Sequence, residues 1–216
     1  TGNVRKVGFG GEEPITIQTM WKEGIENIDS DDGALHETLK KINELKSLGC
    51  DIIRFAVPNM KSAKSLIKIQ KNTDVPLVAD IHFDHRLALE CLNGGIPKIR
   101  INPGNIGNSE KVKEVVFLAL KKNAAIRIGV NSGSLPKDLA LKVADGKMTR
   151  AEALSETAAR ECAAFDSLGF DRYVVSMKAS SVQETVEANE CFAKNYDAPL
   201  HIGVTEAGPL ITGIVK

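Results

Sequence analysis

The sequence has neither an excess of charge of one sign nor many aromatic residues. Lys and Arg together number 28, Asp and Glu also number 28, and the formal net charge is zero. Tyr, Trp and Phe make up only 5% of the 216 residues. Nucleic-acid-binding proteins usually carry a basic face, often with aromatic side chains on which bases stack. The composition therefore argues against a nucleic-acid partner, and affinity for a smaller anion would have to come from a local group of basic side chains.

Paired cysteines and long apolar runs are also missing. The four cysteines lie far apart without a CxxC motif, which predicts reduced, buried or half-buried thiols rather than disulfides or metal ligands. No run of about 18 apolar residues occurs that could span a membrane, and residues 1–13 lack the apolar core of a signal peptide. These absences predict a cytoplasmic protein with no membrane partner and no metal site. The cysteines are Cys50, Cys91, Cys162 and Cys191.

What the sequence does have is a regular alternation of short β-branched segments with amphipathic segments. We expect strands over residues 15–20, 51–57, 76–81, 98–102, 124–130, 173–178 and 199–204, and helices over 31–48, 61–72, 84–93, 109–122, 150–168 and 182–195. The helix over 31–48 is predicted to end before Gly49. Its apolar face would consist of Leu35, Leu39, Ile42, Leu45 and Leu48.

This alternation predicts an α/β fold with a parallel sheet, either closed or open. Polar residues recur at nearly every strand end rather than at one switch point, which favours a TIM-type (β/α)8 barrel over a doubly wound sheet. We expect residues 1–216 to form a single substrate-binding barrel domain. Because seven strands are visible and a barrel needs eight, the sequence predicts an incomplete barrel that lacks its last βα unit.

Six of the expected strands carry charge where they end, which is costly in a buried strand unless the charge is paired or faces a ligand. Alternation along each strand places these side chains on the face that points into the barrel. The segments are DIIRFAVP with Arg54, PLVADIHF with Asp80 and His82, KIRINPGN with Arg100 and Asn102, AIRIGVNSGS with Arg127 and Asn131, YVVSMKAS with Lys178, and LHIGVTEAG with Glu206.

The cations of this set outnumber its two carboxylates, Asp80 and Glu206. A surplus of guanidinium groups predicts a phosphate or diphosphate ligand, because Arg grips such groups with two parallel hydrogen bonds. The glycine-containing turns at 102–105 and 131–134 could add backbone N–H donors. The alternative is a set of buried Arg–Asp pairs that fill the barrel without any ligand.

Single residues give weaker predictions. His82 could act as a general acid or as a hydrogen-bond donor to the ligand, whereas His36, His85 and His201 are expected to be surface or structural residues. The HxxH spacing of His82 and His85 alone is weak evidence for a metal. Lys178 could be the Schiff-base nucleophile of an aldolase, although its arginine companions equally indicate a phosphate clamp.

Taken in series, the strings GCDIIRFAVP, PLVADIHFD, KIRINPGNIG, IRIGVNSGSL, KAS and PLHIGVTEAG resemble one family closely. It is 4-hydroxy-3-methylbut-2-en-1-yl diphosphate synthase of the methylerythritol phosphate route to isoprenoids. The likeness extends over nearly the whole chain and includes the opening GGEEPITIQTM. In that family a barrel binds 2-C-methyl-D-erythritol 2,4-cyclodiphosphate, and a separate C-terminal domain carries a [4Fe–4S] cluster that supplies two electrons for the reductive opening of the ring.

The resemblance implies the roles of individual residues. Glu206, His82 and Asp80 would take part in the chemistry, with Glu206 as the proton donor when water leaves. The substrate would be lined by Arg54, Asp80, His82, Arg100, Asn102, Arg127, Asn131 and Lys178. The resemblance further implies a homodimer and flavodoxin or ferredoxin as the electron donor of the full-length enzyme.

Two departures from the family pattern qualify this expectation. The family usually has a Ser-Met-Thr run where this chain has Thr19-Met20-Trp21, and none of the cysteines has the spacing of cluster ligands. We therefore expect a fragment that binds substrate but is inactive alone, with no cofactor of its own. The alternatives are an autonomous barrel enzyme, either a Lys178 aldolase or a pterin-binding synthase, and an interaction module that pairs through an exposed strand edge.

Overall fold

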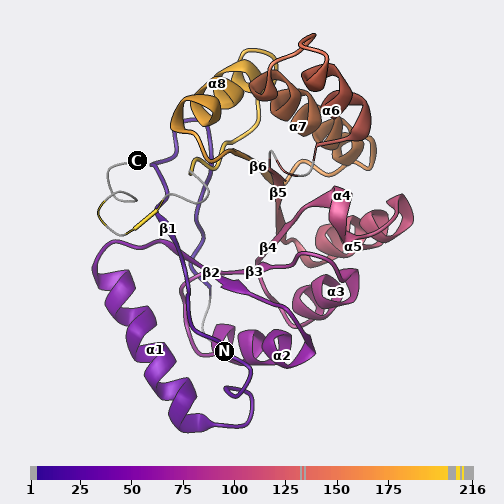
Figure 1. Cartoon of the computed structure of the whole chain (residues 1–216). Helices are drawn as coiled ribbons and strands as arrows, with labels where there is room; N and C mark the ends of the chain where they lie inside the picture. The colour runs from indigo at the N-terminus through magenta and orange to yellow at the C-terminus, as the bar shows by residue number, and fades with distance from the viewer. Residues whose placement is uncertain (1–3, 132, 134, 204–207, 210, 212–216) are drawn as a thin grey trace. The chain divides into compact units, whose positions relative to one another are not determined.

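The computed structural model of the chain describes residues 4–131, 133, 135–203, 208, 209 and 211. It divides into two compact units, Thr1–Ile126 and Arg127–Lys216, and each is described by itself. Both consist of β-strands alternating with α-helices, so the α/β class predicted from the sequence is confirmed (Figure 1).

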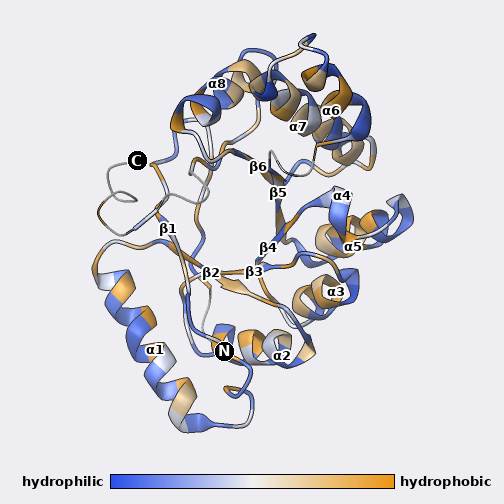
Figure 2. Ribbon diagram, viewed as in Figure 1, coloured by the Kyte–Doolittle hydropathy of each residue, from blue (hydrophilic) through white to orange (hydrophobic). Residues whose placement is uncertain are grey.

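The first unit is built on four parallel strands in the order β1-β2-β3-β4. Two of its helices contact β3 and β4, and the residues between helix and strand are fully buried, among them Leu66, Leu77 and Ile99. Figure 2 shows β2 and β3 coloured mostly as hydrophobic, whereas α1 carries alternating polar and apolar bands. The elements are β1 (Gln18–Met20), α1 (Asp32–Ser47), β2 (Ile52–Ala56), α2 (Met60–Gln70), β3 (Leu77–Asp80), α3 (His85–Asn93), β4 (Lys98–Ile101), α4 (Pro103–Ile106) and α5 (Ser109–Lys122).

The amino-terminal segment covers the start of the strands in this unit. Arg5 donates to the backbone and to the carboxylate of Asp51, at 3.0 and 3.1 Å, just before β2 begins. The ring of Phe9 lies 3.8 Å from Lys98 Nζ, at the start of β4. A cation over an aromatic face is stabilised by the ring quadrupole, so this contact favours the burial of Lys98, which is almost completely buried.

The second unit contains β5 (Ala125–Asn131), whose first two residues belong to the first unit, followed by α6 (Lys137–Ala144), α7 (Arg150–Ser167), β6 (Tyr173–Lys178) and α8 (Val182–Ala193). Helices α7 and α8 pack against each other and against β6. Thr149 and Glu152 form a reciprocal capping box at the start of α7, which satisfies two backbone N–H groups that the helix leaves unpaired.

Several expected boundaries are wrong. The predicted strand over 199–204 is, within its described residues, reduced to one parallel bridge between Val175 and Leu200. The turn at 102–105 is the short helix α4, and α6 lies between the expected strand over 124–130 and the expected helix over 150–168, where no element was predicted. Leu48, predicted on the apolar face of α1, is the cap residue after its end and is 83% exposed.

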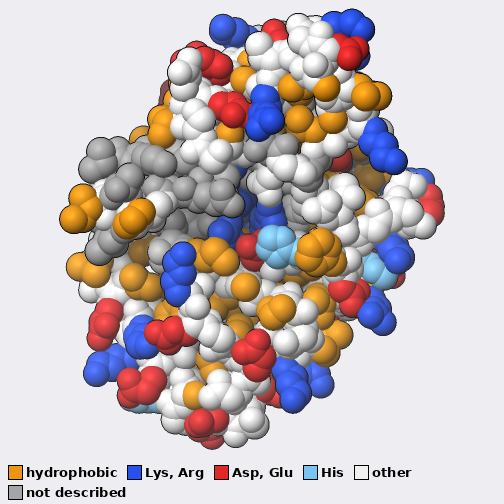
Figure 3. Space-filling model, in the orientation of Figure 1, with side chains coloured by type: hydrophobic (Ala, Val, Ile, Leu, Met, Phe, Trp, Pro, Cys, Tyr) orange, Lys and Arg blue, Asp and Glu red, His pale blue; other side chains and the backbone are white. Residues whose placement is uncertain are grey.

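None of the helices described has the length and the apolar run that crossing a bilayer requires. On the face shown in Figure 3, basic and acidic side chains are intermixed rather than separated.

Candidate functional site

A single buried carboxylate, Asp80 at the end of β3, organises the polar side chains of the first unit. Asp80 is 3% exposed. Its Oδ1 lies 3.3 Å from Nη1 of Arg100, and its Oδ2 lies 3.5 Å from Nε of Arg54. His82 Nε2 is 3.6 Å from Oδ2. We call Arg54, Asp80, His82 and Arg100 the Asp80 cluster.

The strand register explains why these residues meet. Asp80 pairs with Arg100 across β3 and β4, and Arg54 of β2 pairs with Val78, two residues earlier on β3. Because side chains two residues apart point to the same face of a strand, all three charged groups lie on one face, as the alternation in the sequence predicts. The opposite face carries Phe55, Ala79 and Ile99, which are fully buried.

The geometry of His82 defines its tautomer within the cluster. Its Nδ1 lies 3.4 Å from Nη1 of Arg100, and a guanidinium group can only donate. Nδ1 is therefore the acceptor, and the proton of the neutral ring is on Nε2, which faces Asp80. Half of the His82 side chain is exposed, so this donor is within reach of a ligand. Phe83, which follows it, is 75% exposed.

The charges of the Asp80 cluster do not cancel, because two guanidinium groups share one carboxylate. Burial lowers the pKa of Arg54, Asp80 partly offsets that effect, and the neighbouring charge of Arg100 lowers the pKa further. The Nε atoms of Arg54 and Arg100 are buried and have no hydrogen-bond acceptor among the described residues. A net positive charge with unused donors is an arrangement that an anion would stabilise.

Met20 is a contact of this cluster that sequence reasoning missed. Its Sδ lies 2.7 Å from Nη2 of Arg54, and the two residues are paired in register across β1 and β2. The adjacent Trp21 is buried and stacks on Phe55 with ring centroids 5.1 Å apart. The Thr19-Met20-Trp21 segment therefore places a thioether beside Arg54 and an indole in the core. The register of Met20 with Arg54 is the signal that could have revealed the contact.

Asn102 has a structural task in addition to its predicted role. Its Oδ1 accepts a hydrogen bond of 3.2 Å from the backbone N–H of Gly104, which caps α4. Pro103 occupies the first position of that helix, where a missing N–H costs nothing. The buried Asn102 side chain thus orients the chain that leaves β4.

In the second unit, Arg127 on β5 is the centre of a further group. It is 1% exposed, Nε donates to Ser176 Oγ at 3.1 Å, and Nη1 lies 3.2 Å from His201 Nε2. We call Arg127, Ser176 and His201 the Arg127 cluster. The histidine was expected to be merely structural, so its contact with a predicted site arginine is a finding of the structure.

The remaining predicted site residues lie at the ends of β5 and β6 or outside the described residues. Asn131 and Lys178 are the last residues of their strands, and both are half-buried. A Cβ atom added to Gly203 would stand 3.1 Å from Lys178 Nζ, so the ammonium group lies directly over this glycine. Glu206 and two serines of the 131–134 turn lie outside the described residues.

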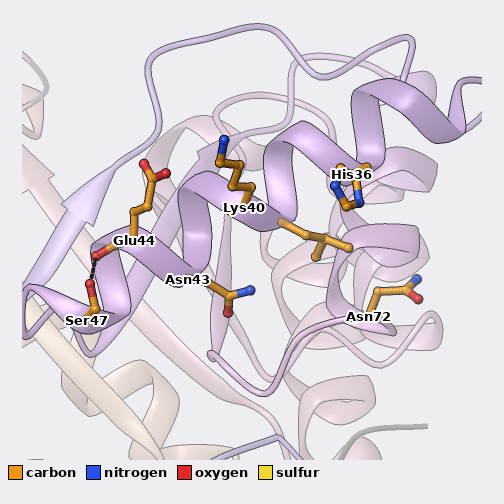
Figure 4. A pocket seen from close by; sticks show the side chains of 7 residues that line it. His36, Lys40, Asn43, Glu44, Ser47 and Asn72 are labelled. Carbon is orange, nitrogen blue, oxygen red and sulfur yellow. Dashed lines mark hydrogen bonds between the residues drawn. The ribbon is translucent and has the colours of Figure 1, made fainter.

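A separate, shallow pocket of about 620 Å³ lies along the outer side of α1 (Figure 4). It contains no residue of the predicted site. In it the hydroxyl of Ser47 donates to the backbone carbonyl of Glu44 at 2.7 Å. The lining residues are His36, Leu39, Lys40, Asn43, Glu44, Ser47 and Asn72.

The cysteines of this chain do not fit the ligands of a [4Fe–4S] cluster. Cys50, Cys91 and Cys162 are buried, and burial raises the pKa of Cys91 and of Cys162 to about 12. A cluster ligand has to be a thiolate, so these thiols are poorly suited to the task. In the described ranges no three His, Cys, Asp or Glu side chains are grouped as a metal site would need. The two histidines of the HxxH motif also face different partners, because His85 lies near Asp84 and Glu114.

Comparison with known proteins places this geometry in a family. The model of the GcpE TIM-barrel domain matches residues 1–216. A 4-hydroxy-3-methylbut-2-en-1-yl diphosphate synthase (flavodoxin) of Treponema denticola is 53% identical over 232 residues, which cover 100% of this chain and 59% of that protein. The enzyme of the same name from Treponema pallidum is 52% identical over 221 residues, covering 99% of this chain and 54% of its own length. The chain thus spans a little over half the length of these relatives.

Solved structures show the same architecture at low sequence identity. The 3-dehydroquinate dehydratase of Geobacillus kaustophilus superposes with a TM-score of 0.59 and 15% identity, covering 99% of this chain and 80% of that one. At such low identity the likeness concerns the fold alone. The full-length match of the family model carries the assignment: the chain belongs to the GcpE TIM-barrel domain family.

Proposed function

We propose that this chain is the substrate-binding barrel of a 4-hydroxy-3-methylbut-2-en-1-yl diphosphate synthase, and that it binds 2-C-methyl-D-erythritol 2,4-cyclodiphosphate. The observation that carries the proposal is the Asp80 cluster, in which two guanidinium groups share one buried carboxylate. The diphosphate would supply the missing negative charge and the acceptors for the buried Nε donors. The two relatives named above, which bear the name of this synthase, support the choice of substrate.

Within this proposal the side chains have distinct tasks. Arg54, Arg100, Arg127 and Lys178 would neutralise and orient the diphosphate, because bidentate and charge-assisted hydrogen bonds are strong and directional. Asn102 and Asn131 would contribute amide hydrogen bonds. Asp80 would hold the two arginines of its cluster in place, and His82 would direct its Nε2 proton towards the ligand. Glu206 would hold the proton that departs with the water molecule.

The electrons for the ring opening would come from outside this chain. In the complete enzyme a [4Fe–4S] cluster would supply them, with ligands that this chain does not contain, and flavodoxin, which the names of the relatives mention, would reduce the cluster. We therefore propose that this chain binds the substrate but does not turn it over. A cytoplasmic location and a homodimer complete the proposal, and light scattering at several concentrations would test the dimer.

Calorimetric titration of this chain with the cyclodiphosphate tests the proposal directly. Hydrogen bonds to charged groups contribute roughly 1.5–3 kcal/mol, so Arg100→Ala and Arg127→Ala should each weaken binding about 10- to 100-fold. Arg150→Ala is the matched control, since its side chain is 58% exposed and its ion pair with Glu184 is long at 3.9 Å. Arg100→Lys should recover only part of the affinity, because it keeps the charge but loses the planar fork.

Two results would contradict the proposal. One is cyclodiphosphate affinity in Arg100→Ala and Arg127→Ala equal to that of the wild type, with circular dichroism showing that both variants are folded. The other is the absence of any binding by the wild-type chain. Borohydride trapping of Lys178 with a carbonyl substrate would instead favour the aldolase alternative.

A further inference from the structure

Among the described residues of the second unit, Ser176 and His201 contact the buried guanidinium group of Arg127. Its Nε donates to the hydroxyl of Ser176 at 3.1 Å, and its Nη1 lies 3.2 Å from Nε2 of His201. A guanidinium group stays charged at any ordinary pH and can only donate hydrogen bonds. Its orientation in a buried site therefore depends on where the acceptors around it are fixed.

The backbone fixes both of these acceptors. The amide of His201 donates to the carbonyl of Val175 at 2.7 Å, and the amide of Val175 donates to the carbonyl of Pro199 at 2.9 Å. Val175 and Leu200 form the parallel bridge. Ser176 and His201 each follow a bridged residue by one position, so they stand side by side on the same face and reach Arg127 together.

The contact between Arg127 and His201 depends on the protonation of the imidazole. Because Nη1 can only donate, Nε2 of His201 has to carry a lone pair, and the ring proton has to be on Nδ1. A second proton on the ring would remove this acceptor and set two cations 3.2 Å apart.

Among the described residues, the neighbouring strands β5 and β6 each carry one cation on the side of residues 199–203. One is Arg127 of β5, and the other is Lys178 of β6, whose Nζ lies over Gly203, two residues after His201. The sequence of β5, β6 and residues 199–203 contains no carboxylate.

We propose that His201 is a positioning residue: as the neutral Nδ1–H tautomer it orients Arg127 for the anion, and it loses this ability when it is protonated. The expected change in cyclodiphosphate affinity rests on the proposed function of Arg127. The expected change in the orientation of the Arg127 side chain does not. Ligand affinity should accordingly fall as the pH drops through the titration of the imidazole.

Two substitutions of His201 distinguish a role in orienting Arg127 from a role in filling space. In His201→Gln the side-chain amide oxygen can take the place of Nε2 as an acceptor but cannot titrate. In His201→Phe the ring is kept and the acceptor is lost. His36→Phe, on the exposed face of α1, is the matched control.

Nitrogen-15 NMR of the chain without ligand tests the orientation of Arg127. In the wild type near pH 8 we expect the Nδ1–H tautomer of His201 and a slowly exchanging Arg127 Nη1–H signal, because Nη1 is the atom that contacts His201. That signal should persist in His201→Gln and be lost in His201→Phe. An Nε2–H tautomer, or an Arg127 signal unchanged in His201→Phe, would overturn the proposal.

Titration with the cyclodiphosphate between pH 6 and pH 8 supplies the second readout. His201→Phe should bind about tenfold more weakly at pH 8, as expected for a lost hydrogen bond to a charged group. His201→Gln should bind within about threefold of the wild type and lose part of the pH dependence. If His201→Phe does not fold, His201→Gln provides the test. A pH dependence of its ligand affinity equal to that of the wild type would contradict the proposal. If the wild type does not bind while the Arg127 signal responds as described, the proposed function fails and the positioning role stands.

Discussion

At the scale of single residues, the strand pattern predicts which side chains share a face but not what each one contacts. Arg54, Asp80 and Arg100 meet because side-chain alternation places them on one face of the sheet and the strand register brings them side by side. The contacts with Met20 and His201 depend on which strands pair. Neither residue type by itself indicates that it will lie beside a buried arginine. Apolar or neutral partners of a buried charge are the part of a site that residue types alone do not reveal.

Met20 offers a test at this scale. Met20→Leu keeps the volume of the side chain but removes the sulfur atom next to Arg54 Nη2. A thioether is a weak acceptor, so we expect the affinity for the cyclodiphosphate to fall about two- to fivefold, with a change in unfolding free energy below about 1.5 kcal/mol. Titration calorimetry measures the first and urea unfolding the second. Met60→Leu, on the partly exposed first turn of α2, is the control; equal affinities of the two variants would show that the sulfur contact does not orient Arg54.

At the scale of secondary-structure elements, caps determine where helices begin. The helix expected over 109–122 begins at Ser109 in the structure, where the side chain of Asn108 accepts a hydrogen bond from the backbone N–H of Lys111. The same logic applied to Asn102 and Pro103 would have predicted α4 in place of a turn. No cap of this kind marks α6, whose N-cap is Pro136 without a side-chain hydrogen bond, and the seventh expected strand was misjudged because β-branched residues favour a strand without guaranteeing a ladder.

The N-cap of α3 leads to a prediction about the loop that carries His82. Asp84 accepts hydrogen bonds from the backbone N–H and from the side chain of Arg86, and these bonds lower the pKa of Asp84 to about 2. Asp84→Ala should lower the unfolding free energy by about 1 kcal/mol, as is usual for a lost N-cap, and Asp84→Asn by less.

The pH dependence of this cap has a definite sign. In the unfolded chain an Asp has a pKa of about 3.9, so the carboxylate contributes to stability above that value, and its contribution is lost as the pH falls towards 2. The difference between the wild type and Asp84→Asn in urea unfolding should therefore shrink from pH 6 to pH 3. An equal difference at both pH values would refute this assignment.

At the scale of the whole chain, the repeating alternation of elements predicts the fold class, and the series of motifs predicts the family. The amino-acid composition argues against a nucleic-acid partner but does not indicate the fold or the family. The assignment of 1–216 as one barrel domain stays a prediction, as does the contribution of both clusters to one ligand. A double-mutant cycle of Arg100→Lys and Arg127→Lys on cyclodiphosphate binding tests that coupling, since independent sites give additive effects.

The buried thiols make overall stability sensitive to alkali. Burial raises the pKa of Cys91 and of Cys162 to about 12, whereas a thiol in the unfolded chain titrates near 8.5. Above about pH 8.5 the unfolded chain loses these protons and the folded chain retains them. The unfolding free energy should therefore fall with rising pH, by up to about 1.4 kcal/mol per pH unit for each thiol.

Urea unfolding between pH 8 and pH 10 would measure this slope. Cys91→Ala should give a flatter slope than the wild type, although a smaller side chain in the core lowers its stability at every pH. Cys191→Ala, which replaces a half-buried thiol, is the comparison. Identical slopes for Cys91→Ala and the wild type would show that this thiol does not contribute.

Because two arginines share Asp80, the cluster attracts anions in general, and different cellular anions would compete for it. A site that attracts by charge alone takes orthophosphate, sulfate or a nucleotide almost as readily as its own ligand, and cells contain such anions at high concentration. Discrimination must then come from groups that fit one shape, such as His82 of the Asp80 cluster. Under the proposed function, inhibitor selectivity would have to come from the sugar-like part of the molecule, with the diphosphate as a common anchor.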